Sequence, residues 1–186
     1  MTIPFGDTVK AQVTQAVISS LLERGGYRVI RLGIEEVFRE IKDKGIEEYR
    51  ALQLPAQLRY LPDLLVASLE ANQSFLVEVK FRRRFDEGAA RGLFDHLERQ
   101  RRYWPDSYAV LTISEPFMAR ARFHQDFIRV LAPHATRRLI DERLDLRQRW
   151  QSLRPLEQVF HNFTASAAHR ALADFATLAL KNLAEL

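Results

Sequence analysis

The feature that most constrains the fold is a pair of short apolar runs separated by a turn. The first run spans residues 64–69 and is almost unbroken apolar, the second spans residues 74–81, and Glu-Ala-Asn-Gln at 70–73 supplies the turn. Apolar runs of this length, bounded by turn residues, are typical of strands that are covered on both faces of a sheet. The pattern therefore predicts a buried hairpin around which the rest of the chain packs.

Three charged residues stand in this hairpin, where a buried strand should avoid them: Asp63, Glu78 and Lys80. With a turn centred on residues 71 and 72, Asp63 lies opposite Lys80. Alternate residues of a strand share a face, so Glu78 joins them on the same side. A slip of one residue would scatter the three charges over both faces. They form either a functional site or a structural charge triad, and burying charges for stability alone gains little.

Pro62-Asp63, followed fifteen positions later by Glu78-Val79-Lys80, resembles the motif of the PD-(D/E)xK nuclease superfamily, which contains restriction endonucleases and archaeal Holliday-junction resolvases. The resemblance covers roughly residues 5–115. It implies that Asp63, Glu78 and the backbone carbonyl of Val79 bind Mg²⁺ or Mn²⁺, and that Lys80 is the catalytic lysine. The implied reaction is hydrolysis of a DNA phosphodiester bond by activated water, with Asp63, Glu78 and Lys80 as the catalytic residues.

The implied fold class is α/β, a restriction-endonuclease-like core with a central mixed sheet flanked by helices and a helical C-terminal extension. Residues 1–115 form the core, and residues 116–186 add the last strand and the extension of the same domain. Periodicity and breakers predict the elements. The expected helices are 7–23 with Asp7 as N-cap, 34–41, 88–103, 137–152, a segment near 156–163 and 166–186. The expected strands outside the hairpin are 27–32, 108–113 and 127–131.

Several residues outside the motif are candidates for accessory roles. In resolvase-like relatives the first helix carries a glutamate near the metal, and Gln15 stands at or near that place here, without the charge. Glu35 and Glu36 could replace that acid, or they could simply complement a helix dipole. Gln100 and Tyr103 resemble a Gln-x-x-x-Tyr feature with one residue fewer between them, so Gln100 is expected to reach the site.

The cluster Arg82-Arg83-Arg84 follows the lysine directly and suits phosphate contacts beside the scissile bond, or else a solvated strand end. The net charge is +4, and its excess lies after residue 115. This distribution is compatible with DNA as a partner. Because Gln15 lacks the expected charge, the alternative is a catalytically impaired nucleic-acid-binding or assembly protein on the same fold.

Composition narrows the remaining classes. The chain of 186 residues has 47% hydrophobic residues and no cysteine, which fits a globular protein without disulfides or thiolate metal sites. No apolar run approaches membrane-spanning length and no signal-peptide pattern is present, so we expect a cytoplasmic protein that does not bind membranes. The amphipathic C-terminal helices pack on their own domain or form a homodimer interface.

Overall fold

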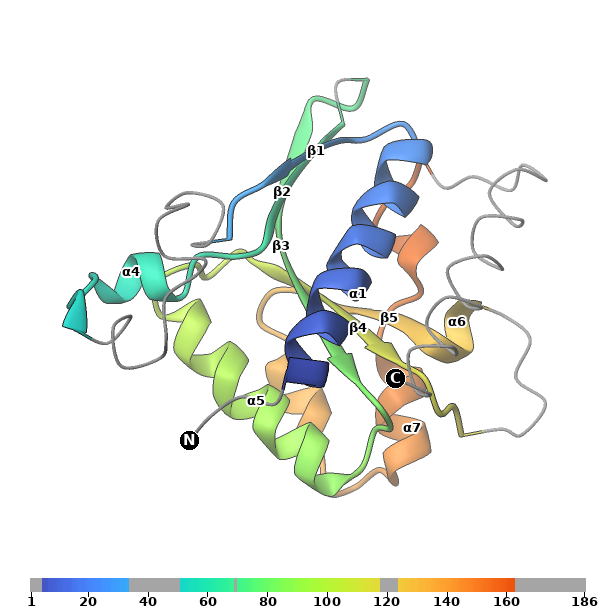
Figure 1. The fold of residues 1–186 in the computed structure, drawn as a ribbon. Coiled ribbons are helices and arrows are strands. Elements are labelled where there is room, and N and C mark those ends of the chain that lie inside the picture. Colours follow the sequence, from blue (N-terminus) through green and yellow to red (C-terminus); the bar gives the residue numbers. More distant parts are fainter. Residues whose placement is uncertain (1–4, 34–50, 69, 118–123, 163–186) are drawn as a thin grey trace.

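The computed structural model describes residues 5–33, 51–68, 70–117 and 124–162, which contain a five-stranded mixed sheet flanked by helices (Figure 1). The strands lie in the order in which they occur in the chain, and β3–β4 is the one parallel pair among those described. Their bounds are β1 Arg28–Arg31, β2 Leu64–Ser68, β3 Gln73–Arg82, β4 Tyr108–Ile113 and β5 Ile128–Leu131. The predicted α/β class is confirmed at this level, as is a strand near each predicted position.

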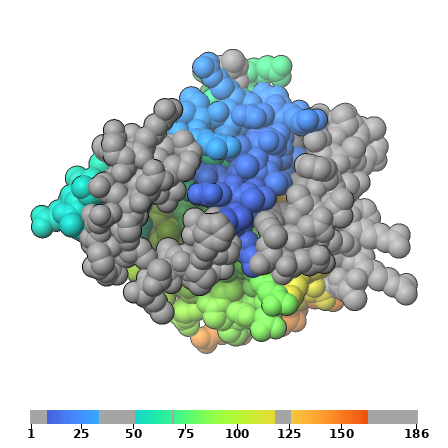
Figure 2. All heavy atoms as spheres, in the orientation of Figure 1, coloured from blue at the N-terminus to red at the C-terminus, as the bar shows by residue number. Residues whose placement is uncertain are grey.

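Two helices cover opposite faces of the sheet. Helix α1 (Phe5–Arg24) packs on the face that carries Val77 and Val79, through Ile18 and Leu22. Helix α5 (Glu87–Arg101) packs on the other face, where its buried leucines meet Ala109, Leu111 and Ile113 of β4. In Figure 2, α1 (blue) crosses the centre of the visible face, with α5 (green) below it and α4 (cyan) at the left. Residues 78 and 80 alternate with the valines and therefore face α5.

The first helix differs from the prediction in its start and in its buried side. It begins at Phe5, so Asp7 lies inside the helix and is not its N-cap. The buried face carries Ile18, Leu21 and Leu22, whereas Val13, predicted to face inward, is 36% exposed. The buried face is therefore rotated from the predicted apolar stripe, with Leu21 shared by both.

The hairpin register differs by two residues from the predicted one. The pairing closes at Ser68 and Gln73, and Leu64 lies opposite Val77. Asn72 adopts the left-handed conformation and the Ser68 hydroxyl accepts a hydrogen bond from the turn, so the chain reverses earlier than expected. Continued by one residue, this register puts Asp63 opposite Glu78 rather than Lys80. A shift of two keeps every paired side chain on its face, so Glu78 and Lys80 share a face as predicted, whereas Asp63 lies in the bend just before β2.

The other helices lie outside the hairpin. Helix α4 (Ala56–Arg59) follows Pro55, and α6 (His124–Phe127) leads into β5. The 3₁₀ helices η2 (Thr136–Ile140) and η3 (Leu156–Gln158) flank helix α7 (Leu146–Ser152). The prediction of a single helix over 137–152 is therefore wrong. In the described part of the predicted segment near 156–163, the structure has the short η3.

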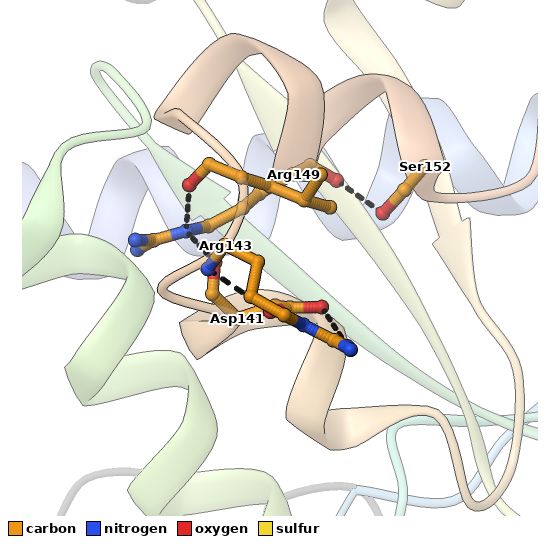
Figure 3. A network of polar contacts seen from close by, with 5 residues as sticks. Asp141, Arg143, Arg149 and Ser152 are labelled. Atoms are coloured by element: carbon orange, nitrogen blue, oxygen red, sulfur yellow. Dashed lines mark hydrogen bonds and ion pairs between the residues drawn. The ribbon is translucent and has the colours of Figure 1, made fainter.

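The break before α7 has a clear cause in the local sequence. Asp145 is the N-cap of α7 and forms a reciprocal capping box with Gln148, which fixes the helix start. Arg149 then donates from Nε to the carbonyl oxygens of Asp141 and Leu144, at 2.8 Å and 2.9 Å (Figure 3). These bonds satisfy loop carbonyls that a continuous helix would have paired internally.

The predicted helices 34–41 and 166–186, with Glu35, Glu36 and the possible homodimer interface, lie outside the described residues. Within the described ranges, no helix is both long and apolar enough to cross a bilayer.

Candidate functional site

The site begins where β2 ends against its two neighbours. The backbone carbonyl of Asp63 accepts a hydrogen bond from Leu32 N at 2.8 Å, which extends the contact with the β1 side. On the other side, Asp63 Oδ2 accepts from Val79 N at 2.8 Å. The aspartate side chain thus takes the place that a further residue of β2 would have occupied beside β3. These two contacts fix the Asp63 carboxylate at the end of the ladder.

Glu78 is the most buried charged group of this site, with a side chain 4% exposed. Its Oε1 forms an ion pair with Lys80 Nζ and lies 3.1 Å from His96 Nε2. Its Oε2 accepts from Gln100 Nε2 at 2.6 Å. An ionised carboxylate only accepts hydrogen bonds, so His96 Nε2 carries the proton in this contact. Three donors from β3 and α5 therefore hold one carboxylate.

The charges of this cluster stabilise each other against burial. Burial alone would raise the pKa of Glu78, but the Lys80 ammonium and the His96 hydrogen bond outweigh it and lower the pKa to about 2. Burial would likewise lower the pKa of Lys80, and the negative charges of Glu78 and then Asp63 hold it above its ordinary value. Glu78 is therefore ionised and Lys80 protonated at neutral pH.

Helix α5 supplies two of the three donors, and sequence reasoning found only one of them. Gln100 reaches the Glu78 carboxylate, as expected from the motif on this helix. The pattern of the motif gave no indication of His96. The missed signal is helical spacing: positions 96 and 100 are four apart, so they lie on one face of α5.

The oxygen atoms at this site suit a hard cation such as Mg²⁺, which takes oxygen ligands and keeps several waters. In a strand, the N–H and C=O of one residue point to the same side. Val79 N points to Asp63, so the Val79 carbonyl points to the same gap beyond the end of β2. By contrast, the Lys80 carbonyl accepts from Thr112 Oγ1 of β4 at 3.2 Å. Asp63, Glu78 and the Val79 carbonyl would thus be the oxygen ligands.

Two further observations bear on whether a cation fits. A carboxylate has about four lone-pair positions, and protein donors take three at Glu78, which leaves one. Gln100 Oε1 is buried without a hydrogen-bond partner among the described residues, so it can accept from a water ligand. No three or more His, Asp or Glu side chains gather as a metal cluster in the described ranges. The ligands of a cation at this place would therefore be two carboxylates, the Val79 carbonyl and water.

Gln15 is half-buried on α1, which packs on the opposite face of the sheet from Glu78. Its accessory role remains a prediction without a contact in the described structure to support it.

The three arginines after the lysine point in different directions. Arg82 lies two residues after Lys80 on β3, and its positive charge tends to lower the pKa of Lys80. Arg83 pairs with Glu115, and Arg84 Nε lies 3.1 Å from Asp86 Oδ2, both at exposed positions. Such surface pairs contribute little to stability. Their proposed contact with phosphates therefore remains a prediction.

No protein-family model, no curated protein and no solved structure matches this chain. Function must therefore be argued from the geometry of the site.

Proposed function

We propose that this chain is a metal-dependent nuclease with a restriction-endonuclease-like core, and that it hydrolyses DNA phosphodiester bonds with activated water. The proposed core is α1, β1, the β2–β3 hairpin, α5 and β4, in the order that the resemblance implies. The proposed catalytic residues are Asp63, Glu78 and Lys80. Asp63, Glu78 and the Val79 carbonyl would bind the Mg²⁺ or Mn²⁺ ion.

One observation carries the proposal: a buried, ionised glutamate pairs with a half-buried, protonated lysine, beside an aspartate that lies just before a strand. Burying such charges costs more than their attraction returns when the only gain is stability. Strongly perturbed carboxylates with a specific charge partner are typical of functional sites. Gln100 and His96 fix the orientation of Glu78, which a ligand requires more than a structural ion pair does.

The chemistry divides among the residues as follows. A bound Mg²⁺ would lower the pKa of a water ligand and offset charge on the phosphate. Lys80 stays protonated beside Glu78, so it acts as a cationic donor rather than a base. It can orient the attacking water or bind a phosphate oxygen as negative charge develops there. Asp63, held by Val79 N, keeps its carboxylate oriented toward the same place.

The experiment is a cleavage assay of the full chain on single-stranded, duplex and branched DNA, with Mg²⁺, with Mn²⁺ and with a chelator. We expect cleavage that requires the metal and is absent with the chelator. Cleavage that persists in the chelator, or no cleavage of any substrate with either metal, contradicts the proposal.

The second candidate function is a catalytically impaired nucleic-acid-binding or assembly protein on the same fold. It is favoured by the position of Gln15 on the opposite face and by the three protein donors that already engage Glu78. DNA binding in the same panel without cleavage would select this candidate.

A further inference from the structure

A stacked pair of tyrosines lies beside the Glu78 site. The rings of Tyr60 and Tyr103 are 5.7 Å apart between centroids and only 12° from parallel. Tyr60 directly follows α4, and Tyr103 lies two residues after the end of α5. Trp104 Nε1 donates to the Gln57 carbonyl at 3.1 Å, which ties α4 to the same end of α5. In Figure 1, α4 (cyan) accordingly sits near the C-terminal end of α5.

One residue joins this pair to the buried carboxylate. The Tyr60 ring lies 6.4 Å from the His96 ring between centroids, and His96 Nε2 is 3.1 Å from Glu78 Oε1. The aromatic surface formed by Tyr60, Tyr103 and His96 is therefore continuous with the site. Tyr103 is 37% exposed, and Tyr60 covers one face of its ring.

Positive charge flanks both tyrosines. Arg59 precedes Tyr60 and Arg102 precedes Tyr103 in the chain, and both arginines are exposed. Aromatic rings interleaved with arginines are typical of surfaces that bind single-stranded nucleic acid, because bases stack on the rings while the cations contact the phosphates.

We propose that Tyr60 and Tyr103 form a stacking surface for an unpaired nucleobase next to the Glu78 site. The inference rests on the proposed nuclease function and specifies its substrate class. A base within a duplex is already stacked on both sides, so it must leave the helix to stack on a side chain. The preferred substrate is therefore a single strand, a frayed end or a flap, with the unpaired base on Tyr103 and its phosphates toward Lys80.

The test measures binding without catalysis. The full chain, in a chelator and at low salt, is titrated with a single-stranded oligonucleotide containing 2-aminopurine and with the same sequence as a duplex. Stacking on a tyrosine quenches the fluorescence of the base. We expect Tyr103→Ala to weaken single-strand binding about tenfold or more and to abolish the quenching. Tyr103→Phe, which keeps the ring, should behave as the wild type.

Two variants separate stacking from structural effects. Phe117→Ala removes a ring of similar exposure, 39%, from a loop at the opposite end of α5, and should change nothing. Trp104→Phe removes a bond that holds α4 and should leave the quenching intact. Equal losses in Trp104→Phe and Tyr103→Ala would mean that Tyr103 only docks α4, and would overturn the inference.

The outcomes also distinguish this inference from the proposed function. If the wild type cleaves DNA and Tyr103→Ala binds single strands as tightly as the wild type, the stacking inference fails alone. If Tyr103→Ala loses quenching but the wild type cleaves no DNA with Mg²⁺ or Mn²⁺, the nuclease proposal fails and the stacking surface stands. Absence of any single-strand binding overturns the inference.

Discussion

Among the described residues, the carboxylates of Glu78 and Asp141 both have a pKa of about 2, and different contacts lower the pKa in each. Glu78 is buried between β3 and α5, where Lys80 and His96 outweigh the effect of burial. Asp141 is half-buried, and bidentate hydrogen bonds from the Arg143 side chain, 2.9 Å and 2.8 Å long, together with one from its backbone N–H, lower its pKa against a smaller opposing effect of burial (Figure 3).

A low pKa of a carboxylate therefore does not by itself identify a functional site. Asp141 and Arg143 are two residues apart in one loop, and their pairing needs no other element. Glu78 instead receives donors from its own strand and from the next helix, 18 and 22 residues further along the chain, at a point where burial opposes them. Only the second arrangement requires an explanation beyond stability, and we attribute it to ligand binding.

The largest expected effect is on cleavage. Asp63→Asn, Glu78→Gln and Lys80→Ala each remove one charge of the proposed site, and each should reduce the cleavage rate about a hundredfold or more. Asp141→Asn removes a carboxylate of equally low pKa from the other region and should leave the rate within about twofold of the wild type. Single-turnover rates measured with Mg²⁺ make the comparison. Comparable losses in Asp141→Asn and Glu78→Gln would remove the distinction between the two regions.

Stability should separate the regions next. Lys80→Met leaves the buried Glu78 charge with only the His96 and Gln100 donors and should lower the free energy of unfolding by about 3 kcal/mol. Arg143→Met leaves Asp141 within reach of water, so the stability should hardly change. Urea unfolding of both variants in a chelator checks this. An Arg143→Met loss as large as that of Lys80→Met would contradict the account.

The position of the site could be predicted from the sequence, but its register and its donors could not. Apolar alternation determines the face of each paired hairpin residue, and an even register shift preserves that face, so Glu78 and Lys80 were correctly assigned to one side. The register itself depends on the conformation of Asn72 and on the Ser68 contact, which no periodicity reports.

The contacts between elements were the hardest to predict. His96 reaches Glu78 only because α5 packs on one face of the sheet with a particular rotation, which is a tertiary property. The start of α7 could have been predicted from the sequence, since Asp145 and Gln148 have the spacing of a capping box. Helical periodicity across 137–152 masked that signal.

Acid unfolding should show a smaller difference. The folded pKa of Glu78 is about 2, against an ordinary value of 4.5, so the unfolded state binds the proton first as the pH falls. The stability that this charge confers is complete above the ordinary pKa and is lost between about pH 4.5 and pH 2. Glu78→Gln should therefore flatten the dependence of unfolding free energy on pH in this window.

Asp141→Asn is the comparison variant for the acid experiment. Its group also has a folded pKa of about 2, but water near the surface screens its pairing, so the flattening should be weaker. Urea titrations at several pH values between 5 and 2.5 give the slopes. A steeper dependence in Glu78→Gln than in the wild type would contradict the sign.

The smallest expected effect concerns the arginines after the site. Replacing Arg82, Arg83 and Arg84 with alanine should weaken DNA binding and flatten its salt dependence, by about 0.9 in log–log slope for each lost duplex phosphate contact. Replacing Arg143 alone should leave the slope unchanged, because that guanidinium is held by Asp141. Fluorescence anisotropy over a range of salt concentrations measures the slopes. An unchanged slope in the triple variant would return these arginines to a solvated strand end.

The central claim is that the carboxylates of Asp63 and Glu78, unlike Asp141, bind a divalent cation. The most direct measurement is a titration of Mn²⁺ into the metal-free full chain, in which calorimetry and the Mn²⁺ electron paramagnetic resonance signal report binding. We predict a site that Asp63→Asn and Glu78→Gln each abolish or weaken strongly, and that Asp141→Asn leaves intact. Wild-type protein that binds no Mn²⁺, or binding that both site variants retain, would contradict the account.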